Sequence, residues 1–562
     1  MSDRTEPPAA PDTPPASSPR LVVSARATAL REESRDWMSW DLTPRQLWDL
    51  ELLINGSFAP LSGFMTQLDY DCVIRDMRLS SGRLWPLPVR LGVSAAVAGR
   101  LAPGMRLALR DPEGVMLAAL HVDNVWSDDA AATLGRSAET GHGWFVGGRV
   151  EAVQSPVHHD FTALRLTPAQ VQAEITRRGW KQTIGLAPFG LLHRAEVAAI
   201  ESLMGEHQAG VVVYVADGPR GDVHHYARMR CHRAVLARFP PGQALLVLSQ
   251  PVGERRDARA ELALAILQKQ CGCTHVALVP DEASDEAGVR ERGLRAHARE
   301  IGLDVIPLPR YAYVAERNRH EPADEARRGE GQISPPDLRR LLENGTNIPD
   351  WFTYPEIAEQ LRRSYPPRRA QGLTVFFTGL SGSGKSTLAN ALLDLLLERG
   401  GRTVTLLDGD LARRHLSSEL GFSKAHRTLN VRRIGYVASE ITRSGGIAIC
   451  ALIAPHAAIR EEVRRMIEAV GGFVLVHVAT TLEVCESRDR KGLYAKARAG
   501  LLAEFTGISD PYEVPEDADL TINAGEASVA EAASAVLRHL EVAGYLLPDM
   551  TEAERTSVDA PD

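Results

Sequence analysis

The residues from Gly379 to Thr387 have the types and spacing that bind phosphate groups. They read G-L-S-G-S-G-K-S-T and fit the pattern G-x-x-x-x-G-K-[ST]. In such a loop, successive backbone N–H groups and the start of the next helix point toward one anion. We expect Lys385 to reach the β- and γ-phosphates of a nucleoside triphosphate and Ser386 to ligate Mg²⁺. The remaining expected contacts of the loop with the triphosphate come from Gly379, Ser381, Gly382, Ser383, Gly384 and Thr387.

The segments on either side of this loop are those that a phosphate site needs. Leu373–Thr378 is continuously apolar or β-branched, which is typical of a buried parallel strand. The segment from Leu388 to Leu396 has good helix propensity and an apolar face. A chance Gly/Ser turn is the alternative, but the strand–loop–helix context favours a nucleoside triphosphate site.

A second strand, Thr403–Leu407, leads into Asp408-Gly409-Asp410. Ligands of open α/β sheets bind at the carboxyl ends of the strands, so these acids are expected to face the Lys385 loop. One carboxylate can hold Mg²⁺ and the other can accept a proton from an attacking hydroxyl group. A simple turn at the end of the strand is the alternative.

Two basic segments follow, at residues 421–435 and 485–498. Such charge runs are usually solvated helix faces. Beside a phosphate loop, however, arginine side chains can bind a second phosphate or sulfate group, because their planar fork matches its oxygens. The later segment is basic and contains a glycine hinge at Gly492, which suits a lid that closes over the phosphates.

Residues 371–545 resemble adenosine-5′-phosphosulfate (APS) kinase. The resemblance rests on the loop and D-G-D described above, on G-F-S…R…N-x-R-R-I-G, on R-D-x-K-G-L-Y-x-K-A-R-x-G and on F-T-G-I-x-D-P-Y-E. It implies transfer of the ATP γ-phosphoryl group to the 3′-hydroxyl of APS, which yields PAPS and ADP. Another small-molecule kinase is the alternative, and the retained motifs argue against it.

The resemblance assigns roles by position. Asp410 would take or orient the proton of the hydroxyl group, Asp408 would serve the metal, and Arg488 would contact ATP. The implied APS contacts are Arg413, Phe422, Arg427, Asn430, Ile453, Lys491, Leu493 and Phe505. The chain departs from the family pattern at His426, Leu429, Ala454 and His456, and we still expect activity.

The composition is that of a soluble globular protein. The 562 residues carry a net charge of −8, which argues against a nucleic-acid-binding protein that neutralises many phosphates. The first twenty residues lack the apolar core of a signal peptide, and the apolar run from Ile447 to Ala454 is too short to span a membrane. Six scattered cysteines are typical of reduced thiols, so we expect a cytoplasmic protein without membrane partners.

The chain is expected to be an α/β protein of several domains. Residues 1–20 and 546–562 are expected to be loose tails. Residues 21–165, with segments such as 85–91 and 115–120, indicate a β-rich domain. Residues 166–345 alternate strands with helices and indicate a Rossmann-like domain with a parallel sheet. Residues 346–370 form a connecting segment, and residues 371–545 form the phosphate-loop domain with a parallel sheet.

Residues 21–365 resemble ATP sulfurylase (sulfate adenylyltransferase), above all through L-L-x-N-G-x-F-x-P-L-x-G-F-M within residues 46–70. The family binds ATP and sulfate through Q-T-R-N-P-x-H-x-x-H and G-R-D-H-A-G. Of the first motif only His193 remains, and Asp281 remains at the place of the second. Because adenylyl transfer to sulfate needs cations at these positions, we expect this region to be catalytically inactive.

Two alternatives stay open for the N-terminal half. It could still work, which would make the chain a bifunctional enzyme that converts sulfate to PAPS, or it could serve as an oligomerising or nucleotide-sensing module. Fused sulfurylase–kinase chains often form dimers or hexamers, so the resemblance implies a homo-oligomer. The expected partners are the small molecules ATP and APS.

Overall fold

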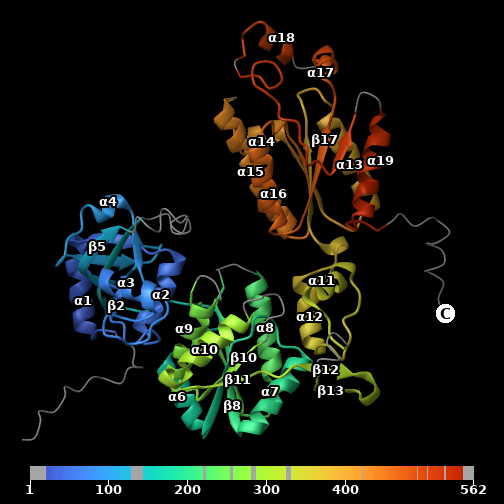
Figure 1. Cartoon of the computed structure of the whole chain (residues 1–562). Coiled ribbons are helices and arrows are strands. Elements are labelled where there is room, and N and C mark those ends of the chain that lie inside the picture. The colour runs from blue at the N-terminus through green and yellow to red at the C-terminus, as the bar shows by residue number, and fades with distance from the viewer. Residues whose placement is uncertain are drawn as a thin grey trace, which may run out of the picture. The chain divides into compact units, whose positions relative to one another are not determined.

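The computed structural model describes residues 21–127, 143–218, 223–253, 257–279, 287–323, 331–421, 423–489, 492–502, 504–523 and 527–547. The chain forms two compact units (Figure 1). The first comprises Met1–Ser334 and Ile348–Gln360, and the second comprises Pro335–Asn347 and Leu361–Asp562. The chain therefore passes from one unit to the other more than once.

The first part of the N-terminal unit contains a six-stranded sheet in the order β1-β4-β5-β6-β2, with β3 also paired to β6. Its strands are β1 Met38–Asp41, β2 Gly63–Phe64, β3 Leu91–Val93, β4 Arg106–Arg110, β5 Met116–Ser127 and β6 Trp144–Ala152. Its helices are α1 Ser24–Glu33, α2 Pro44–Ile54, α3 Gln67–Asp76 and α4 Ala95–Ala98. All pairs except the parallel β1–β4 pair are antiparallel, so the expected β-rich domain is confirmed.

One expected strand is wrong. The segment 85–91 is irregular up to Arg90, and β3 begins only at Leu91. Pro86 and Pro88 have no N–H group to donate to a neighbouring strand, which explains why the alternating pattern does not form a ladder there. The other expected segment, 115–120, lies in β5 from Met116 onward.

The second part of this unit is built on a five-stranded sheet in the order β11-β10-β7-β8-β9, in which every pair is parallel. Its strands are β7 Gln182–Leu186, β8 Ala209–Ala216, β9 Ala244–Ser249, β10 His275–Leu278 and β11 Asp304–Pro307. Its helices are α6 Pro168–Arg177, α7 Arg194–His207, α8 Val223–Leu236, α9 Ala258–Gln270 and α10 Ala287–Ile301. A hairpin of β12 Tyr311–Val314 and β13 Arg319–Pro322 follows. The expected parallel α/β sheet is confirmed.

The second unit also contains a five-stranded parallel sheet, in the order β15-β16-β14-β17-β18. Its strands are β14 Leu373–Thr378, β15 Val404–Asp408, β16 Ile447–Ala451, β17 Gly472–Val478 and β18 Leu520–Ile522. Its helices include α11 Pro335–Asn344, α13 Lys385–Arg399, α14 Gly409–His415, α15 Lys424–Arg443, α16 Ala457–Glu468, α17 Leu482–Arg488, α18 Leu493–Arg498 and α19 Val529–Val542. Helix α12, Pro355–Ser364, crosses the boundary between the two units.

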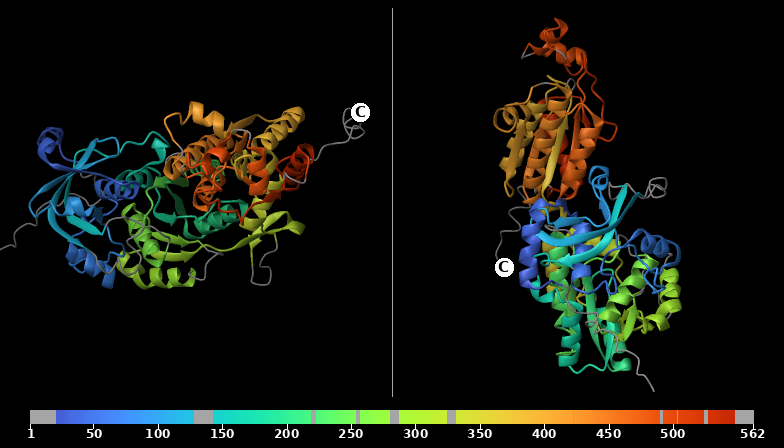
Figure 2. Two further views of the ribbon diagram at one scale, coloured as in Figure 1. Left: turned by 90° about the horizontal axis from the view of Figure 1, so that it is seen from above. Right: turned by 90° about the vertical axis from the view of Figure 1, so that its left-hand side faces the viewer.

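Helices cover both faces of this second sheet (Figures 1 and 2). Successive side chains of β14 point to opposite faces. Val375 and Phe377 pack in the core formed with α13 and α19, whereas Phe376 packs in the core formed with α15 and α16. Because both faces are filled by side chains, a ligand can approach this sheet only at the ends of its strands.

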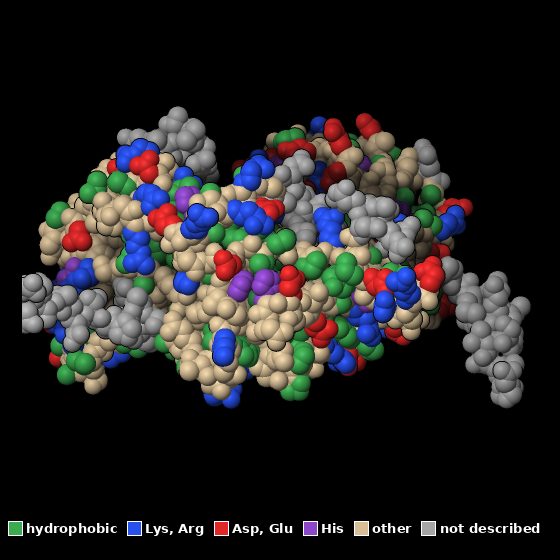
Figure 3. Space-filling view, turned by 60° about the horizontal axis from the view of Figure 1, so that its bottom comes forward, with side chains coloured by type: hydrophobic (Ala, Val, Ile, Leu, Met, Phe, Trp, Pro, Cys, Tyr) green, Lys and Arg blue, Asp and Glu red, His purple; other side chains and the backbone are tan. Residues whose placement is uncertain are grey.

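Side chains of both charge signs are interspersed on the face drawn in Figure 3. No helix among the described residues has the length and apolar character needed to cross a membrane. All six cysteines are free thiols, and five of them are buried.

Candidate active site

The phosphate-type loop joins the carboxyl end of β14 to the first turn of α13. Gly382 and Gly384 have φ values of 75° and 105°, a region that favours glycine, so the loop needs these residues to turn. The ammonium group of Lys385 donates to Leu380 O at 2.6 Å and to Ser383 Oγ at 3.3 Å. Lys385 is only 7% exposed, so its charge lies inside the loop. The loop thus concentrates one cation and several N–H groups at one place.

Asp408 ends β15 and connects two parts of the site. Its Oδ2 accepts a hydrogen bond from Ser386 Oγ at 2.7 Å. Its Oδ1 accepts from the backbone N–H of Asp410 at 2.9 Å and caps α14. One carboxylate oxygen therefore makes the turn at the end of the strand, while the other meets the Ser386 hydroxyl. A hydroxyl and a carboxylate oxygen side by side are ligands that suit Mg²⁺.

Asp410 and Arg413 lie on α14, on the side of the sheet where β15 ends. Burial lowers the pKa of the Arg413 guanidinium, the nearby Asp410 carboxylate opposes that shift, and the positive charge of Arg427 adds to it. Two guanidinium groups therefore influence each other here. Such a pair is stabilised by an anion placed between or beside the two groups.

Arg427 and Asn430 lie one turn apart on α15 and each has a buried polar atom without a hydrogen-bond partner, Nε and Oδ1 respectively. The remaining atoms of the Arg427 guanidinium are held firmly. They donate to Glu504 O at 2.6 Å, to Thr506 Oγ1 at 3.0 Å and to Asp510 Oδ2 at 2.6 Å. Buried polar groups are normally satisfied, so two unpartnered polar atoms one turn apart on α15 make this part of the helix a candidate for binding a polar ligand.

Residues of the expected lid lie against the phosphate loop. Arg488 Nη1 donates to Gly382 O at 3.4 Å, and the Tyr494 hydroxyl donates to Ser381 O at 2.8 Å. Leu493 begins α18, and the ring of Phe505 meets that of Tyr494 with centroids 5.1 Å apart. Three expected site residues lie outside the described residues, namely Phe422, Lys491 and Asp281.

Ile453 lies in the irregular segment between β16 and α16, and its carbonyl accepts a hydrogen bond from Thr378 Oγ1 at 2.7 Å. The next residue, Ala454, has a φ of 41°, which is uncommon for a residue with a side chain. The sequence patterns assign no role to Asp510 or Tyr494. Both belong to quoted motifs, so the signal was present, but their contacts depend on segments far apart in the chain.

His193 is fixed in place by structural contacts in the N-terminal unit. It is the N-cap residue of α7, its Nδ1 lies 2.9 Å from Thr353 Oγ1, and its ring packs on Phe352 with centroids 4.2 Å apart. Desolvation by burial lowers the pKa of His193 to about 4. The imidazole is therefore neutral near pH 7 and supplies no positive charge to an anion there.

The neighbours of His193 also serve the fold. The Glu196 carboxylate accepts from the backbone N–H of His193 at 2.9 Å and completes the cap of α7. The Phe189 ring lies under the Arg290 guanidinium, 5.0 Å from its centre. An acid and an aromatic ring therefore occupy two positions at which the sulfurylase motif has His and Arg.

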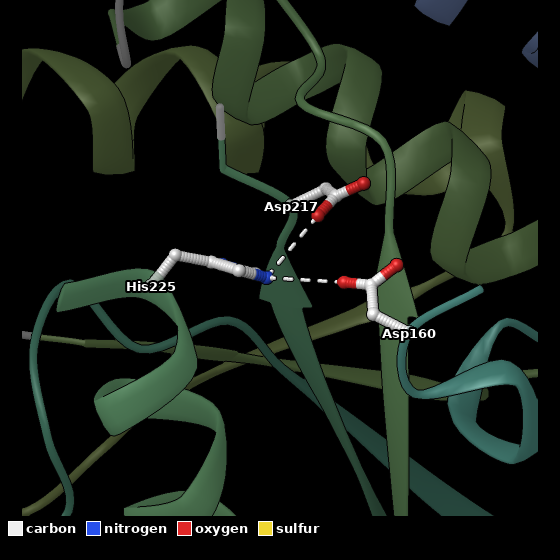
Figure 4. Close-up of side chains that lie close together, drawn as sticks. All are labelled: Asp160, Asp217 and His225. Atoms are coloured by element: carbon white, nitrogen blue, oxygen red, sulfur yellow. Dashed lines mark ion pairs between the residues drawn. The ribbon is translucent and has the colours of Figure 1, made fainter. Parts of the chain in front are cut away.

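A separate cluster in this unit is the group of possible metal ligands found among the described residues, Asp160, Asp217 and His225 (Figure 4). His225 Nε2 faces Asp217 Oδ1 at 3.3 Å and Asp160 Oδ2 at 3.9 Å. However, Arg165 already binds the other two carboxylate oxygens, at 2.6 and 2.9 Å. Arg228 lies 3.3 Å from His225 Nδ1 and can only donate, so a neutral ring carries its proton on Nε2.

Two carboxylates are thus balanced by two guanidinium groups, and the histidine nitrogen that faces them holds a proton instead of a free lone pair. Burial lowers the pKa of His225, which agrees with a neutral ring. A divalent cation would add uncompensated positive charge at this place. We conclude that the cluster is an ion-pair network that ties residues 160–165 to the end of β8.

Comparison with protein families assigns each part of the chain. The model for adenylylsulphate kinase matches residues 371–523, that for ATP-sulfurylase matches residues 162–364, and that for a PUA-like domain matches residues 15–154. The phosphate loop and the Arg427–Asn430 cluster lie in the first of these matches, and His193 lies in the second.

Two relatives align with this chain over nearly their whole length. Sulfate adenylyltransferase of Mycosarcoma maydis is 39% identical over 550 residues, which cover 92% of this chain and 96% of that protein. Sulfate adenylyltransferase of Neosartorya fischeri is 38% identical and covers 90% and 93%. A solved structure described as a hexameric APS kinase from Thiobacillus denitrificans matches with a TM-score of 0.79 and 38% identity, over 95% of this chain and 99% of that one. The chain therefore belongs to the sulfate adenylyltransferase family, in the form that joins an ATP-sulfurylase region and an APS kinase region for sulfate activation.

Proposed function

We propose that the second unit is a working APS kinase and that the sulfurylase region of the first unit is catalytically silent. In the kinase reaction the 3′-oxygen of APS attacks the γ-phosphorus of ATP. A new O–P bond forms, the bond between the γ-phosphorus and the β–γ bridging oxygen breaks, and the products are PAPS and ADP. The observation that carries this proposal is the pair of unpartnered polar atoms on Arg427 and Asn430 of α15, a helix that packs on the sheet that bears the Lys385 loop.

Each residue of the ATP site around the Lys385 loop has a role in this reaction. Lys385 stabilises negative charge on the β- and γ-phosphates, and the loop N–H groups position them. Asp410 is exposed at the start of α14, where it can accept the proton of the 3′-hydroxyl. Ser386 and Asp408 would hold Mg²⁺, which when bound neutralises charge on the phosphates. Arg488 would contact ATP from the lid side.

The APS side is formed by groups from several segments. Arg413 and Arg427 would bind the charged phosphosulfate, and Asn430 would donate or accept one hydrogen bond. Phe505 would pack against the adenine ring, opposite Phe422. The remaining proposed contacts are Ile453, Lys491 and Leu493.

Three features support a silent sulfurylase region. His193 is neutral and holds Thr353 and Phe352, Glu196 caps a helix, and Phe189 replaces a cation. Removal of a single donor to developing negative charge typically costs about 10²- to 10³-fold in rate. Loss of several such groups, with an added carboxylate, takes the rate below a useful level.

A bifunctional enzyme is the second candidate, because relatives that align over nearly their whole length are named sulfate adenylyltransferase. The two candidates differ in one assay. Supplied with APS and pyrophosphate, a bifunctional enzyme forms ATP, and a silent sulfurylase region does not. The Lys385→Ala variant is the right protein for this assay, since it leaves the first unit intact and cannot consume APS as a kinase.

The kinase proposal is tested with APS and ATP on the full chain. We expect PAPS from the natural protein and none from Lys385→Ala, whereas Lys269→Ala, the same change at an exposed site of the first unit, should behave as the natural protein. Absence of PAPS from the natural protein would refute the kinase proposal. Robust ATP formation from APS and pyrophosphate would refute the silent sulfurylase region.

The assembly is proposed to be a homo-oligomer. The solved relative that covers almost the whole chain is described as hexameric. Mass measurement of the purified protein in solution distinguishes a hexamer from a dimer or a monomer.

A further inference from the structure

Tyr494 occupies an unusual position between two parts of the kinase site. It is 2% exposed, and its hydroxyl donates to Ser381 O in the phosphate loop at 2.8 Å. The Asp489 carboxylate accepts from the backbone N–H groups of Tyr494 at 3.1 Å and Ala495 at 3.0 Å. The start of α18 is thereby fixed, and the tyrosine hydroxyl is held against the phosphate loop.

The hydroxyl contact bears on phosphate binding through the geometry of one peptide. In a trans peptide the C=O and the next N–H point in opposite directions. Holding Ser381 O toward Tyr494 therefore turns the N–H of Gly382 away from Tyr494. That N–H belongs to the row of donors that a phosphate loop uses. A single hydrogen bond thus orients a group that would bind ATP.

The ring of the same residue meets the other half of the site. Tyr494 and Phe505 contact edge to face, with centroids 5.1 Å apart and ring planes at 80°. The residue after Phe505 is Thr506, which is 3% exposed and accepts from Arg427 Nη1 at 3.0 Å. The ring therefore supports the segment that carries both Phe505 and a partner of Arg427.

We propose that Tyr494 is a positioning residue that couples the ATP site to the APS site, with its hydroxyl acting on the first and its ring on the second. This inference rests on the proposed kinase function. The proposal predicts separate effects on ATP binding and on APS binding, which a tyrosine with a purely structural role would not produce. Removal of the hydroxyl alone should affect ATP, and removal of the ring should affect APS as well.

The test uses Tyr494→Phe and Tyr494→Leu in the full chain, with binding measured by calorimetry for a non-hydrolysable ATP analogue and for APS. The first variant should weaken binding of the ATP analogue about three- to tenfold, as expected for one lost hydrogen bond. Its affinity for APS alone should remain within about twofold. The second variant should weaken both ligands. Tyr436→Phe, at a tyrosine of α15 that is 60% exposed, is the matched control and should change neither.

Coupling gives a second readout. In the natural protein, APS should bind more tightly when the ATP analogue is present. The ratio of the APS affinity with the analogue to the APS affinity without it should fall toward one in both Tyr494 variants. The proposal is overturned if Tyr494→Phe weakens neither ligand, or weakens both equally while Tyr436→Phe does not. A natural protein that forms PAPS and shows such a result refutes only the role of Tyr494. A natural protein that neither binds APS nor forms PAPS refutes the proposed function together with this inference.

Discussion

Truncation of Asn430 to alanine should separate ligand binding from protein stability. Asn430 is 4% exposed on α15, and its Oδ1 has no hydrogen-bond partner. A buried side chain whose polar atom serves the fold would be paired. The unpaired state predicts that Asn430→Ala weakens APS binding and leaves the stability of the second unit nearly unchanged.

The magnitudes follow from two opposing terms. An unpaired buried acceptor costs about 1–3 kcal/mol, and truncation of Asn430 recovers that cost. Truncation also removes the packing contacts of the buried carboxamide. Their energy is similar to that cost, at roughly 0.8 kcal/mol for each group comparable to a methylene. The net change is within about 1 kcal/mol, or about 2–4 °C in Tm for a unit of this size. One hydrogen bond lost to APS is about 1–1.5 kcal/mol, which is roughly a five- to tenfold rise in KM for APS.

The assay measures Tm by calorimetry and KM for APS and ATP by PAPS formation. Ser439→Ala is the control on the same helix, because Ser439 is 3% exposed and its hydroxyl already donates to Tyr436 O at 2.7 Å. We expect the control to leave both KM values unchanged. A large drop in Tm for Asn430→Ala with an unchanged KM for APS would show that the side chain serves the fold and would refute the reasoning.

Three further predictions concern charge. Asp410→Ala should abolish PAPS formation in a coupled kinase assay while ATP still binds, and a near-normal rate would exclude Asp410 as the proton acceptor. Asp408→Asn should raise the Mg²⁺ concentration needed for half-maximal rate, since it removes the charge beside Ser386, and an unchanged Mg²⁺ titration would contradict this. The pKa of His193 is lowered from 6.5 to about 4, so the unfolded chain binds a proton that the folded one does not between these values. Folding stability should therefore fall as the pH falls from about 6.5 to about 4, and His193→Asn should make this fall shallower in denaturant titrations. His232, whose pKa is also about 4, contributes to the same slope, so only part of it should disappear.

Local patterns of the sequence predicted much of the fold. The continuous apolar segment Leu373–Thr378 became β14, and the apolar run from Ile447 to Ala454 contains β16, because a strand covered on both faces needs apolar side chains at every position. The segment 85–91 failed, because alternation of side chains says nothing about the N–H groups that two prolines remove. The alternation of apolar and polar residues indicates which side chains are buried, but hydrogen bonding between strands also needs backbone N–H donors.

Some contacts of the candidate site can be predicted from the sequence, and others cannot. The loop around Lys385 is a single continuous segment, so its contacts could be anticipated from spacing alone. The ion pair of Arg427 with Asp510 joins residues 83 positions apart, and the contact of Tyr494 with Ser381 joins residues 113 positions apart. No local pattern specifies which distant acceptor a buried donor will find. These pairings arise only when the sheet brings the segments together.

The division of the chain into two units affects how the kinase half can be isolated. The chain enters the second unit at Pro335 and returns to the first unit at Ile348. It enters the second unit again at Leu361. Helix α11 belongs to the second unit, where Glu343 lies 3.7 Å from Arg368. No single cut separates the two units, and a fragment that starts near residue 371 would lack α11. The chain crosses between the two units three times, so truncation at any one peptide bond leaves one of the two units incomplete.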